Sequence, residues 1–479
     1  MLAILIAITT TYAIVAWRNT HLGIWILAAL LPSYLLRAEI IGVPTTLLEM
    51  LVVTLIVVWI TKNIRRVQSE CSLKKSLSQT FRPLSIEFAF PILFLLISAI
   101  AVFASPDKIA ALGIWKAYFL EPIILFFIVK NEIKKDPVLS DKIFEALGFC
   151  AIFLSIVAIV QWFTGKGIPI PWDFERRVTS VFDYPNALGL FLGPIIIIAL
   201  IKDLFPNSRS CLLRGPLGRS TATGEARDHL NVGFTYISAA RSPTRGNLIE
   251  LGNRPIIAAK NLKKKSLQKS FFWASTLILS AVSIVLAQSE AAIVAVIITT
   301  ILVGLLNRKT KLTTITIAAI LSLLIAISPW RGPVLNKLTL QDYSGQVRIT
   351  QWSETLKMQQ DHWLFGAGLS GYPIVFAPYH KASHIEIFQY PHNIFLNFWV
   401  ELGIAGLIVF LVFSFLVSRV SLFSPSLSTT SQLSYFTLLE IFIHGLVDVP
   451  YFKNDLAILT WMLLAMFFTY AQTDKTTSK

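Results

Sequence analysis

Residues 341–403 read QDYSGQVRITQWSETLKMQQDHWLFGAGLSGYPIVFAPYHKASHIEIFQYPHNIFLNFWVELG. On either side of this stretch the chain consists mainly of apolar runs, and from Ile394 onward the stretch itself becomes apolar again. It contains four of the chain's seven histidines. Because apolar helices offer few groups for chemistry, this stretch is the first place to look for a functional site.

The composition excludes an ordinary soluble domain. Hydrophobic residues make up 54% of the chain and charged residues 14%, against about 25% charged in soluble domains. Only helices satisfy their own backbone across a bilayer, and about 20 apolar residues suffice. We therefore predict an all-α polytopic integral membrane protein with about 12–13 transmembrane helices. The net charge of +15 is unevenly distributed, so we attribute it to membrane topology and expect no nucleic-acid partner.

The predicted spans follow the apolar runs, which fall at 2–17, 22–36, 43–60, 86–104, 109–129, 143–163, 186–203, 271–288, 290–306, 312–328, 393–417, 433–450 and 454–470. The first run lacks a basic start and a cleavage signal, so we expect it to be retained. Basic connections at 62–82, 130–142 and 307–311 belong in the cytoplasm by the positive-inside rule. Alternation then places 164–185 and 329–392 on the outer face.

This pattern divides the chain into five regions. They are N-terminal transmembrane helices (1–203), a basic insertion (204–270), central transmembrane helices (271–328), a large outer loop with short helices (329–392) and C-terminal transmembrane helices (393–479). Residues 205–269 hold twelve Lys and Arg against three acids. We expect this insertion to be disordered in the cytoplasm near anionic headgroups. A regulatory or nucleic-acid role is the alternative.

The large outer loop begins with a predicted helix over 345–360, which follows two good N-cap residue types, Asp342 and Ser344. We expect one face of this helix to pack on the membrane or the bundle, formed by Val347, Trp352, Leu356 and Gln359. Arg348 lies in its first turn, where the helix dipole opposes a cation. An anionic ligand bound to Arg348 would offset this unfavourable interaction. The alternative is a surface ion pair between Arg348 and Asp342.

Two other patterns in this loop have weak support. Residues 366–371 spell GxGxxG, but Tyr372-Pro373 blocks the helix that a dinucleotide site needs, so we interpret the glycines as turn residues. His380 and His384 have a metal-ligand spacing, but the segment after them favours a strand or loop over a helix, so we expect no metal. No cofactor is implied.

His392 lies where the outer loop meets the next apolar run. A base with a near-neutral pKa at the water–membrane boundary suits chemistry on a lipid-linked substrate. The alternative is an interfacial anchor, like the neighbouring Tyr390.

Arg176 and Arg177 lie in the smaller outer loop, where the charge rule disfavours them. Paired guanidinium groups bind phosphate well, although Asp173 and Glu175 could neutralise them. Charged or titratable groups within or beside apolar runs are costly and mark a polar interior or ion pairs. These groups are Lys116, Glu121, Glu290, His444 and Asp448.

Three motifs now resemble the O-antigen ligase and polymerase family. Arg177-Val-Thr-Ser-Val-Phe-Asp-Tyr-Pro-Asn186 is similar to its R-x-T/S-G/S-x-F-x-x-P-N stretch. Arg348-Ile-Thr-Gln-Trp352, followed by 361–368, resembles its R-x-x-x-W…P-x-x-G-x-G segment. His392-Asn393-Ile-Phe-Leu396, with Glu401-Leu-Gly403, resembles its H-N-x-x-L…E-x-G-x-x-G motif.

The resemblance implies a metal-independent inverting glycosyltransferase of the GT-C type. It would transfer a glycan from an undecaprenyl-diphosphate carrier to a hydroxyl of a lipid, glycan or protein acceptor, on the outer face of the bacterial cytoplasmic membrane. The implied catalytic residues are His392 as base, with Arg348 and Arg177 stabilising the leaving phosphate. The implied substrate-binding residues are Arg176, Asn186, Trp352, Asn393 and Glu401.

The chain departs from the family pattern at two places. Ser289-Glu290-Ala291 stands where the family often shows Ser-Arg-Gly, and the insertion at 204–270 lies outside the pattern. A polytopic transporter of a lipid-linked or small solute is the alternative function, weakly favoured by the charged groups in apolar runs.

Overall fold

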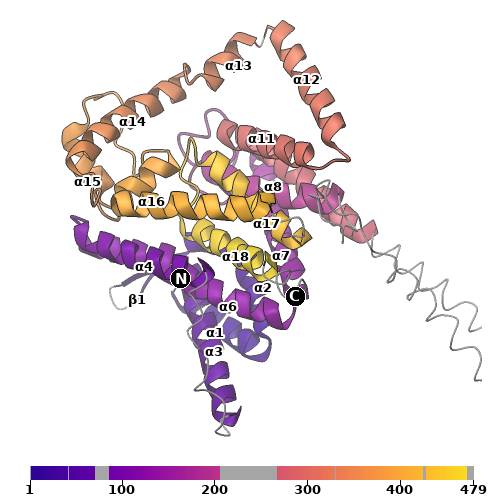
Figure 1. The fold of residues 1–479 in the computed structure, drawn as a ribbon, viewed down its shortest axis with the longest axis vertical. Helices are drawn as coiled ribbons and strands as arrows, with labels where there is room; N and C mark the ends of the chain where they lie inside the picture. Colours follow the sequence, from indigo (N-terminus) through magenta and orange to yellow (C-terminus); the bar gives the residue numbers. More distant parts are fainter. Residues whose placement is uncertain are drawn as a thin grey trace, which may run out of the picture.

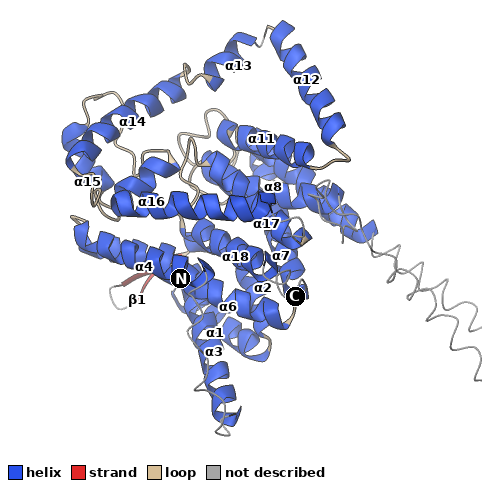
Figure 2. Cartoon of the chain, viewed as in Figure 1, coloured by secondary structure: helices blue, strands red, loops and turns tan. Residues whose placement is uncertain are grey.

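The computed structural model describes residues 2–40, 43–70, 86–204, 267–329, 331–423 and 428–471. Within them nearly all regular structure is helical (Figure 2). The exception is one antiparallel hairpin of β1 (Arg37–Ile40) and β2 (Val43–Thr46), in which Arg37 pairs with Thr46. The prediction of an all-α membrane protein is confirmed. The predicted basic insertion falls almost entirely outside the described residues.

Each predicted apolar run contains helix, although residues 43–46 form β2 and residues 445–450 lie beyond α17. The N-terminal helices are α1 (Leu2–Arg18), α2 (Thr20–Ala29), the 3₁₀-helix η1 (Leu31–Leu35), α3 (Leu47–Glu70), α4 (Ile86–Ala104), α5 (Lys108–Trp115), the π-helix η2 (Lys116–Leu120), α6 (Glu121–Lys135), α7 (Val138–Thr164) and α8 (Pro185–Leu204). A further helix spans Leu267–Leu286. It is followed by α11 (Glu290–Leu306), α12 (Lys311–Ile327), α13 (Arg331–Leu338), α14 (Tyr343–Asp361), α15 (Tyr372–Phe376), the 3₁₀-helix η3 (Ala377–Tyr379), α16 (Ile394–Phe423), α17 (Thr429–His444) and α18 (Asn454–Ala471).

Eight helices of the described chain are long and apolar enough to cross a membrane. A ninth is possible if α12 and the segment 331–361, which meet at 112°, form one broken span. Three further apolar helices, α1, α2 and α11, are shorter. This count is lower than the expected 12–13 spans. The expected number would be reached only if helices of 10–17 residues also crossed about 30 Å, which requires thinning of the bilayer or snorkelling of polar residues.

The core of the bundle is α18, which packs against α6 and α17, while α8 packs against α11 and α17. Two pairs of charged or titratable groups at one end of the bundle each include an acid of the connection 130–142, which is predicted to be cytoplasmic. His21 lies 3.3 Å from Glu132, and Lys202 lies 2.5 Å from Asp141. We call this end, which holds the α1–α2 and α6–α7 turns, the basic end.

Helix α16 is broken at Gly403, which has φ 69° and ψ −176°. The rings of Phe398 and Phe410 lie only 4.1 Å apart, although twelve residues of straight helix would separate their Cα atoms by about 18 Å. The chain therefore turns sharply at Gly403, and the first part of α16 folds back towards the second.

Helices α12, α13 and α14 leave the bundle after α11 and form an arch that returns at α16 (Figure 1). No residue of α12 or α13 is buried, whereas α14 contacts α15, η3 and α16. Buried side chains therefore fix only the last part of the arch, while α12 contacts α11 without burying a residue.

Most of the charged groups predicted to be costly have partners. Lys116 lies 3.2 Å from Glu49, Glu290 pairs with Lys337, and His444 lies 3.6 Å from Glu440 within α17. Glu121 is buried, and neither of its carboxylate oxygens has a hydrogen-bond partner in the described chain.

Candidate functional site

His392 lies beside the loop that joins α17 to α18, which we call the 445–453 loop. Its Nδ1 is 3.5 Å from Asp448 Oδ1, and 29% of the His392 side chain is exposed. This distance is longer than an ordinary hydrogen bond, and His392 Nδ1 forms none in the described chain. Phe388 packs edge-on against the imidazole. The backbone of His392 has φ 47°, a conformation that is strained outside glycine and is concentrated at functional sites.

Asp448 is a buried carboxylate that remains ionised. Burial raises its pKa, but His392, His444 and the N–H of Val449 lower it by more, to about 2. The Val449 N–H donates to Asp448 Oδ1 at 2.8 Å. The imidazole of His392 therefore faces a fixed negative charge on one side and is partly open on the other.

The same loop also binds Arg348 and Asn393 through its main-chain carbonyl groups. Arg348 Nε donates to Val447 O at 3.0 Å and its Nη1 to Ser344 O at 3.3 Å. Asn393 Nδ2 donates to Leu446 O at 2.9 Å. Arg348 therefore does not form the ion pair with Asp342 that was the alternative. Arg348 and the adjacent pair His392 and Asn393, which are distant from it in sequence, therefore contact the same turn of chain.

Helix α14 is fixed over this turn by side-chain hydrogen bonds. Trp352 Nε1 donates to Pro391 O at 2.7 Å, and Gln351 Nε2 donates to Tyr390 O at 2.9 Å. These bonds hold the residues just before His392 against the helix that carries Arg348. Trp352, predicted to bind substrate, has its indole N–H engaged in this contact.

The buried face of α14 differs from the predicted one. Leu356 is 46% exposed, so it does not pack on the bundle, and its packing on the membrane stays a prediction. The buried residues of this helix are Gly345, Gln351, Glu354, Thr355, Met358 and Gln359. The reason is that most are polar side chains, several hydrogen-bonded to the loop, a pattern that apolar periodicity does not reveal.

Glu354 is the centre of this polar face. Its carboxylate lies 2.9 Å from His380 Nδ1 and accepts the N–H groups of Lys381 and Ala382 at 3.0 and 3.2 Å. His380 Nε2 lies 2.8 Å from Ile385 O. Both ring nitrogens of His380 are thus engaged in holding the loop.

The glycine-rich segment 366–371 lies across α16 and α4. The N–H of Ala367 donates to Val400 O at 2.7 Å, and that of Ser370 donates to Glu401 Oε2 at 2.8 Å. A Cβ on Gly366 would lie 2.2 Å from Val400 O. The interpretation of these glycines as turn residues agrees with this close backbone approach. Glu401, predicted to bind substrate, is fully buried and engaged in this contact.

Arg177 forms a second cluster in the 165–184 loop. Its Nε donates to Ala287 O at 3.2 Å, and its Nη2 lies 3.4 Å from Gln288 O and 3.5 Å from Asn186 Oδ1. The guanidinium stacks 4.9 Å from the ring centre of Trp172. Arg177 is therefore held by neutral acceptors and not neutralised by Asp173 or Glu175. Its neighbour Arg176 is exposed, with φ 51°.

The two clusters are connected through Lys453, the last residue of the 445–453 loop. Its ammonium nitrogen lies 4.9 Å from the ring centre of Phe182 and 5.5 Å from that of Tyr184. Both rings belong to the 165–184 loop that carries Arg177. The structure thus places the two loops side by side at one end of the bundle, which we call the site end.

Comparison with known protein families gives one match. Residues 275–411 match the family model described as O-Antigen ligase. This part of the chain is similar to the O-antigen ligase family. The chain is a multi-pass membrane protein whose function is of the O-antigen ligase or polymerase type. A search of curated proteins found no match.

The O-antigen ligase segment contains Arg348 and His392 but neither Arg177 nor the 445–453 loop. Sequence reasoning selected Asp448 only as a costly charge near a membrane boundary, and did not pair it with His392. It did not select Lys453. Their shared position, in a short polar turn between two apolar runs on the predicted outer face, is the signal that could have found them.

Proposed function

We propose that this protein is a metal-independent inverting glycosyltransferase acting on the outer face of the bacterial cytoplasmic membrane. The donor is a glycan on an undecaprenyl-diphosphate carrier, and the acceptor is a hydroxyl of a lipid, polysaccharide or protein. The proposal rests on one observation: His392 and Arg348 both contact the 445–453 loop. His392 faces Asp448 of this loop, and Arg348 donates to Val447 O.

His392 is the general base in this mechanism. Its Nδ1 faces the carboxylate of Asp448, which stabilises the imidazolium and leaves Nε2 to accept the acceptor's hydroxyl proton, as in acid–His dyads. The acceptor oxygen attacks the anomeric carbon of the donor sugar as its proton passes to Nε2. The bond from that carbon to phosphate breaks on the opposite face, and the lipid diphosphate leaves with the electron pair, so the configuration inverts.

Arg348 and Arg177 stabilise the charge that develops on the departing diphosphate. Each guanidinium has five N–H donors, and main-chain carbonyls or an amide oxygen occupy only some of them in the described chain. Neutral acceptors orient a guanidinium without cancelling its charge. Both side chains therefore keep positive charge and free donors for phosphate oxygens.

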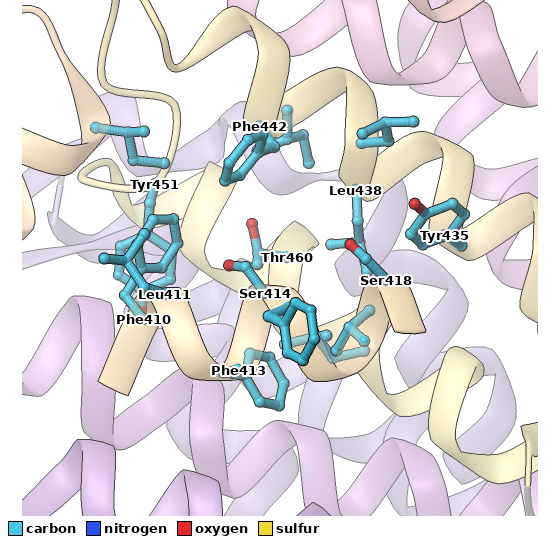
Figure 3. Close-up of a pocket in the computed structure, with 16 residues that line it drawn as sticks. Phe410, Leu411, Phe413, Ser414, Ser418, Tyr435, Leu438, Phe442, Tyr451 and Thr460 are labelled. Atoms are coloured by element: carbon cyan, nitrogen blue, oxygen red, sulfur yellow. The ribbon is translucent and has the colours of Figure 1, made fainter. Parts of the chain in front are cut away.

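An apolar pocket near this site is suited to the isoprenoid chain of the donor. It has a volume of about 390 Å³ and lies between α16, α17 and α18 (Figure 3). Its lining includes Ile394 and Tyr451, which lie two and three residues from His392 and Asp448 along the chain. A chain bound here would place its diphosphate towards the 445–453 loop.

The test compares surface-glycan profiles of cells that lack the gene and express variants. We expect His392→Ala to abolish transfer, because loss of a general base costs about 10²–10⁴-fold. Arg348→Ala and Arg177→Ala should do the same, because removal of one charge-stabilising donor costs about 10²–10³-fold. Asp448→Asn should reduce the rate by up to about 10⁴-fold while leaving the protein folded, because the imidazolium loses its carboxylate partner.

The matched control is His384→Ala, because His384 is an exposed histidine of the same loop. It should restore the profile fully, and a chelator should not inhibit. Short surface-glycan chains in the deletion strain would identify the protein as a polymerase. Long glycan chains that remain on the carrier, unattached to an acceptor, would identify it as a ligase. If His392→Ala restores the profile, the mechanism is wrong, and an unchanged profile in the deletion strain favours the transporter alternative.

A further inference from the structure

Lys453 carries a buried charge that the mechanism above does not use. Its ammonium nitrogen lies 5.3 Å from the ring centre of Tyr34 in η1, in addition to its contacts with Phe182 and Tyr184. Aromatic faces attract a cation through their quadrupole. Two distant segments of the chain, η1 and the 165–184 loop, therefore contribute rings around this one ammonium group.

The aromatic rings do not satisfy the ammonium's three N–H donors. The nitrogen is buried and has no hydrogen-bond partner within the described part of the chain. Burial lowers the pKa of Lys453, and the charges of Asp455, Asp448 and Asp183 act in the opposite direction without hydrogen-bonding to it. A buried cation without acceptors is strongly unfavourable, so an oxygen-rich partner is missing from this position.

The position of Lys453 favours an anion as that partner. Its carbonyl accepts the N–H of Ala457, so Lys453 lies at the N-terminus of α18, where the helix dipole opposes a cation and attracts an anion. Lys453 belongs to the loop that binds Arg348, and its side chain contacts the loop that carries Arg177.

We propose that Lys453 is a further phosphate-binding residue of the donor site, whose ammonium binds the diphosphate of the lipid-linked donor together with Arg177 and Arg348. The inference rests on the proposed function and adds a residue outside the segment that matches the family model. Phe182 and Tyr184 then have the role of holding the ammonium in place when the site is empty.

The test measures binding of farnesyl diphosphate to the full-length protein in detergent, with farnesol as the ligand that lacks the headgroup. In Lys453→Met the affinity for farnesyl diphosphate should fall about 10–100-fold, because a hydrogen bond to a charged group is lost. The affinity for farnesol should not change. The matched control is Lys381→Met, an exposed lysine of the outer loop, which should bind both ligands as the wild type does.

Thermal unfolding of the same variants separates binding from a structural role. Lys453→Met should unfold at the wild-type temperature or above, because methionine packs among aromatic rings and removes an unpaired charge. Equal affinity of Lys453→Met and wild type for farnesyl diphosphate would overturn the inference and leave the proposed function intact. Loss of both ligands with a lower unfolding temperature would assign Lys453 a structural role. A wild type that binds farnesol and farnesyl diphosphate equally would overturn the proposed donor as well.

Discussion

At the scale of single residues, the site uses main-chain carbonyl groups to orient its arginines. Arg348 donates to Val447 O and Ser344 O, and Arg177 donates to Ala287 O. A carboxylate partner would orient a guanidinium equally well but would cancel the charge that a phosphate needs. The single carboxylate at the 445–453 loop, Asp448, instead faces His392. The two arginines therefore keep a positive charge that no carboxylate offsets, whereas the proposed base, His392, faces a carboxylate.

His380 and Glu354 give the outer loop a pH-dependent stability. Burial lowers the pKa of His380, but Glu354 and Ile385 O raise it by more, so it lies above its usual 6.5. Burial likewise raises the pKa of Glu354, and its bonds to the loop and to His380 lower it by more, to below 4.5. The His380 contribution is full below about pH 6.5 and is lost as the pH rises through the raised value. The Glu354 contribution is lost as the pH falls through the lowered value.

We therefore expect the loop to be most stable at mildly acidic pH. Amide hydrogen exchange over 377–386, corrected for its intrinsic pH dependence, should show protection falling as the pH rises above about 6.5. His380→Gln should remove most of this dependence, while His384→Gln should keep it because His384 is exposed. Parallel pH profiles for wild type and His380→Gln would contradict the assignment.

At the scale of elements, the outer loop is fastened to the bundle where the segment 364–371 crosses α16. The N–H of Ile404 donates to Leu364 O at 3.3 Å, and that of Ala367 to Val400 O at 2.7 Å. The break in α16 exposes the main-chain groups that make this crossing possible. The crossing anchors the C-terminal end of α14, and thereby the helix that carries Arg348.

Gly403→Ala should disrupt this crossing. A Cβ there would lie 2.1 Å from Leu364 O, and φ is 69°, so we expect a loss of about 2 kcal/mol or more in the free energy of unfolding. The matched control is Gly113→Ala in α5, where a Cβ would meet nothing within 4 Å. This substitution should raise the free energy of unfolding by about 1 kcal/mol, because alanine favours the helix more than glycine does. Thermal unfolding in detergent measures both. Equal stability of the two variants would show that the crossing does not constrain α16.

At the scale of the whole molecule, the chain has two chemically different ends. The site end joins the 165–184 loop, the turn at Ala287–Gln288, α14 with the loop after it, and the 445–453 loop. The basic end joins the α1–α2 and α6–α7 turns through His21, Glu132 and Asp136. By the positive-inside rule we expect the basic end to face the cytoplasm, and we therefore propose that the site end lies on the outer face.

Single cysteines in a background without Cys71 and Cys211 test this orientation. Lys166→Cys and Lys381→Cys, both at exposed positions of the two outer loops, should react with a membrane-impermeant maleimide in intact cells. Lys309→Cys, exposed in the α11–α12 turn, should react only after permeabilisation. Labelling of Lys309→Cys in intact cells, with protection of the other two, would invert the topology.

The sequence by itself determined the fold class and the candidate arginines and histidine. The reason is that apolar length and basic-residue bias are local properties that bilayer thickness and membrane potential impose on any chain. The same local patterns predicted that 345–360 is helical and that 366–371 is a turn. They did not reveal the buried face of α14, because that face is held by polar bonds from Gln351, Thr355 and Glu354.

Only the tertiary structure decided which residues act together. Asp448 is 56 positions from His392 in sequence and lies 3.5 Å from it in space, and Val447 O reaches Arg348 across 99 positions. Such partners depend on how α14, α16 and α17 pack, and no local pattern encodes them. The position of Lys453 among rings from η1 and the 165–184 loop has the same origin. Local sequence patterns therefore indicate the candidate site residues, and the packing of the helices determines which residues they contact.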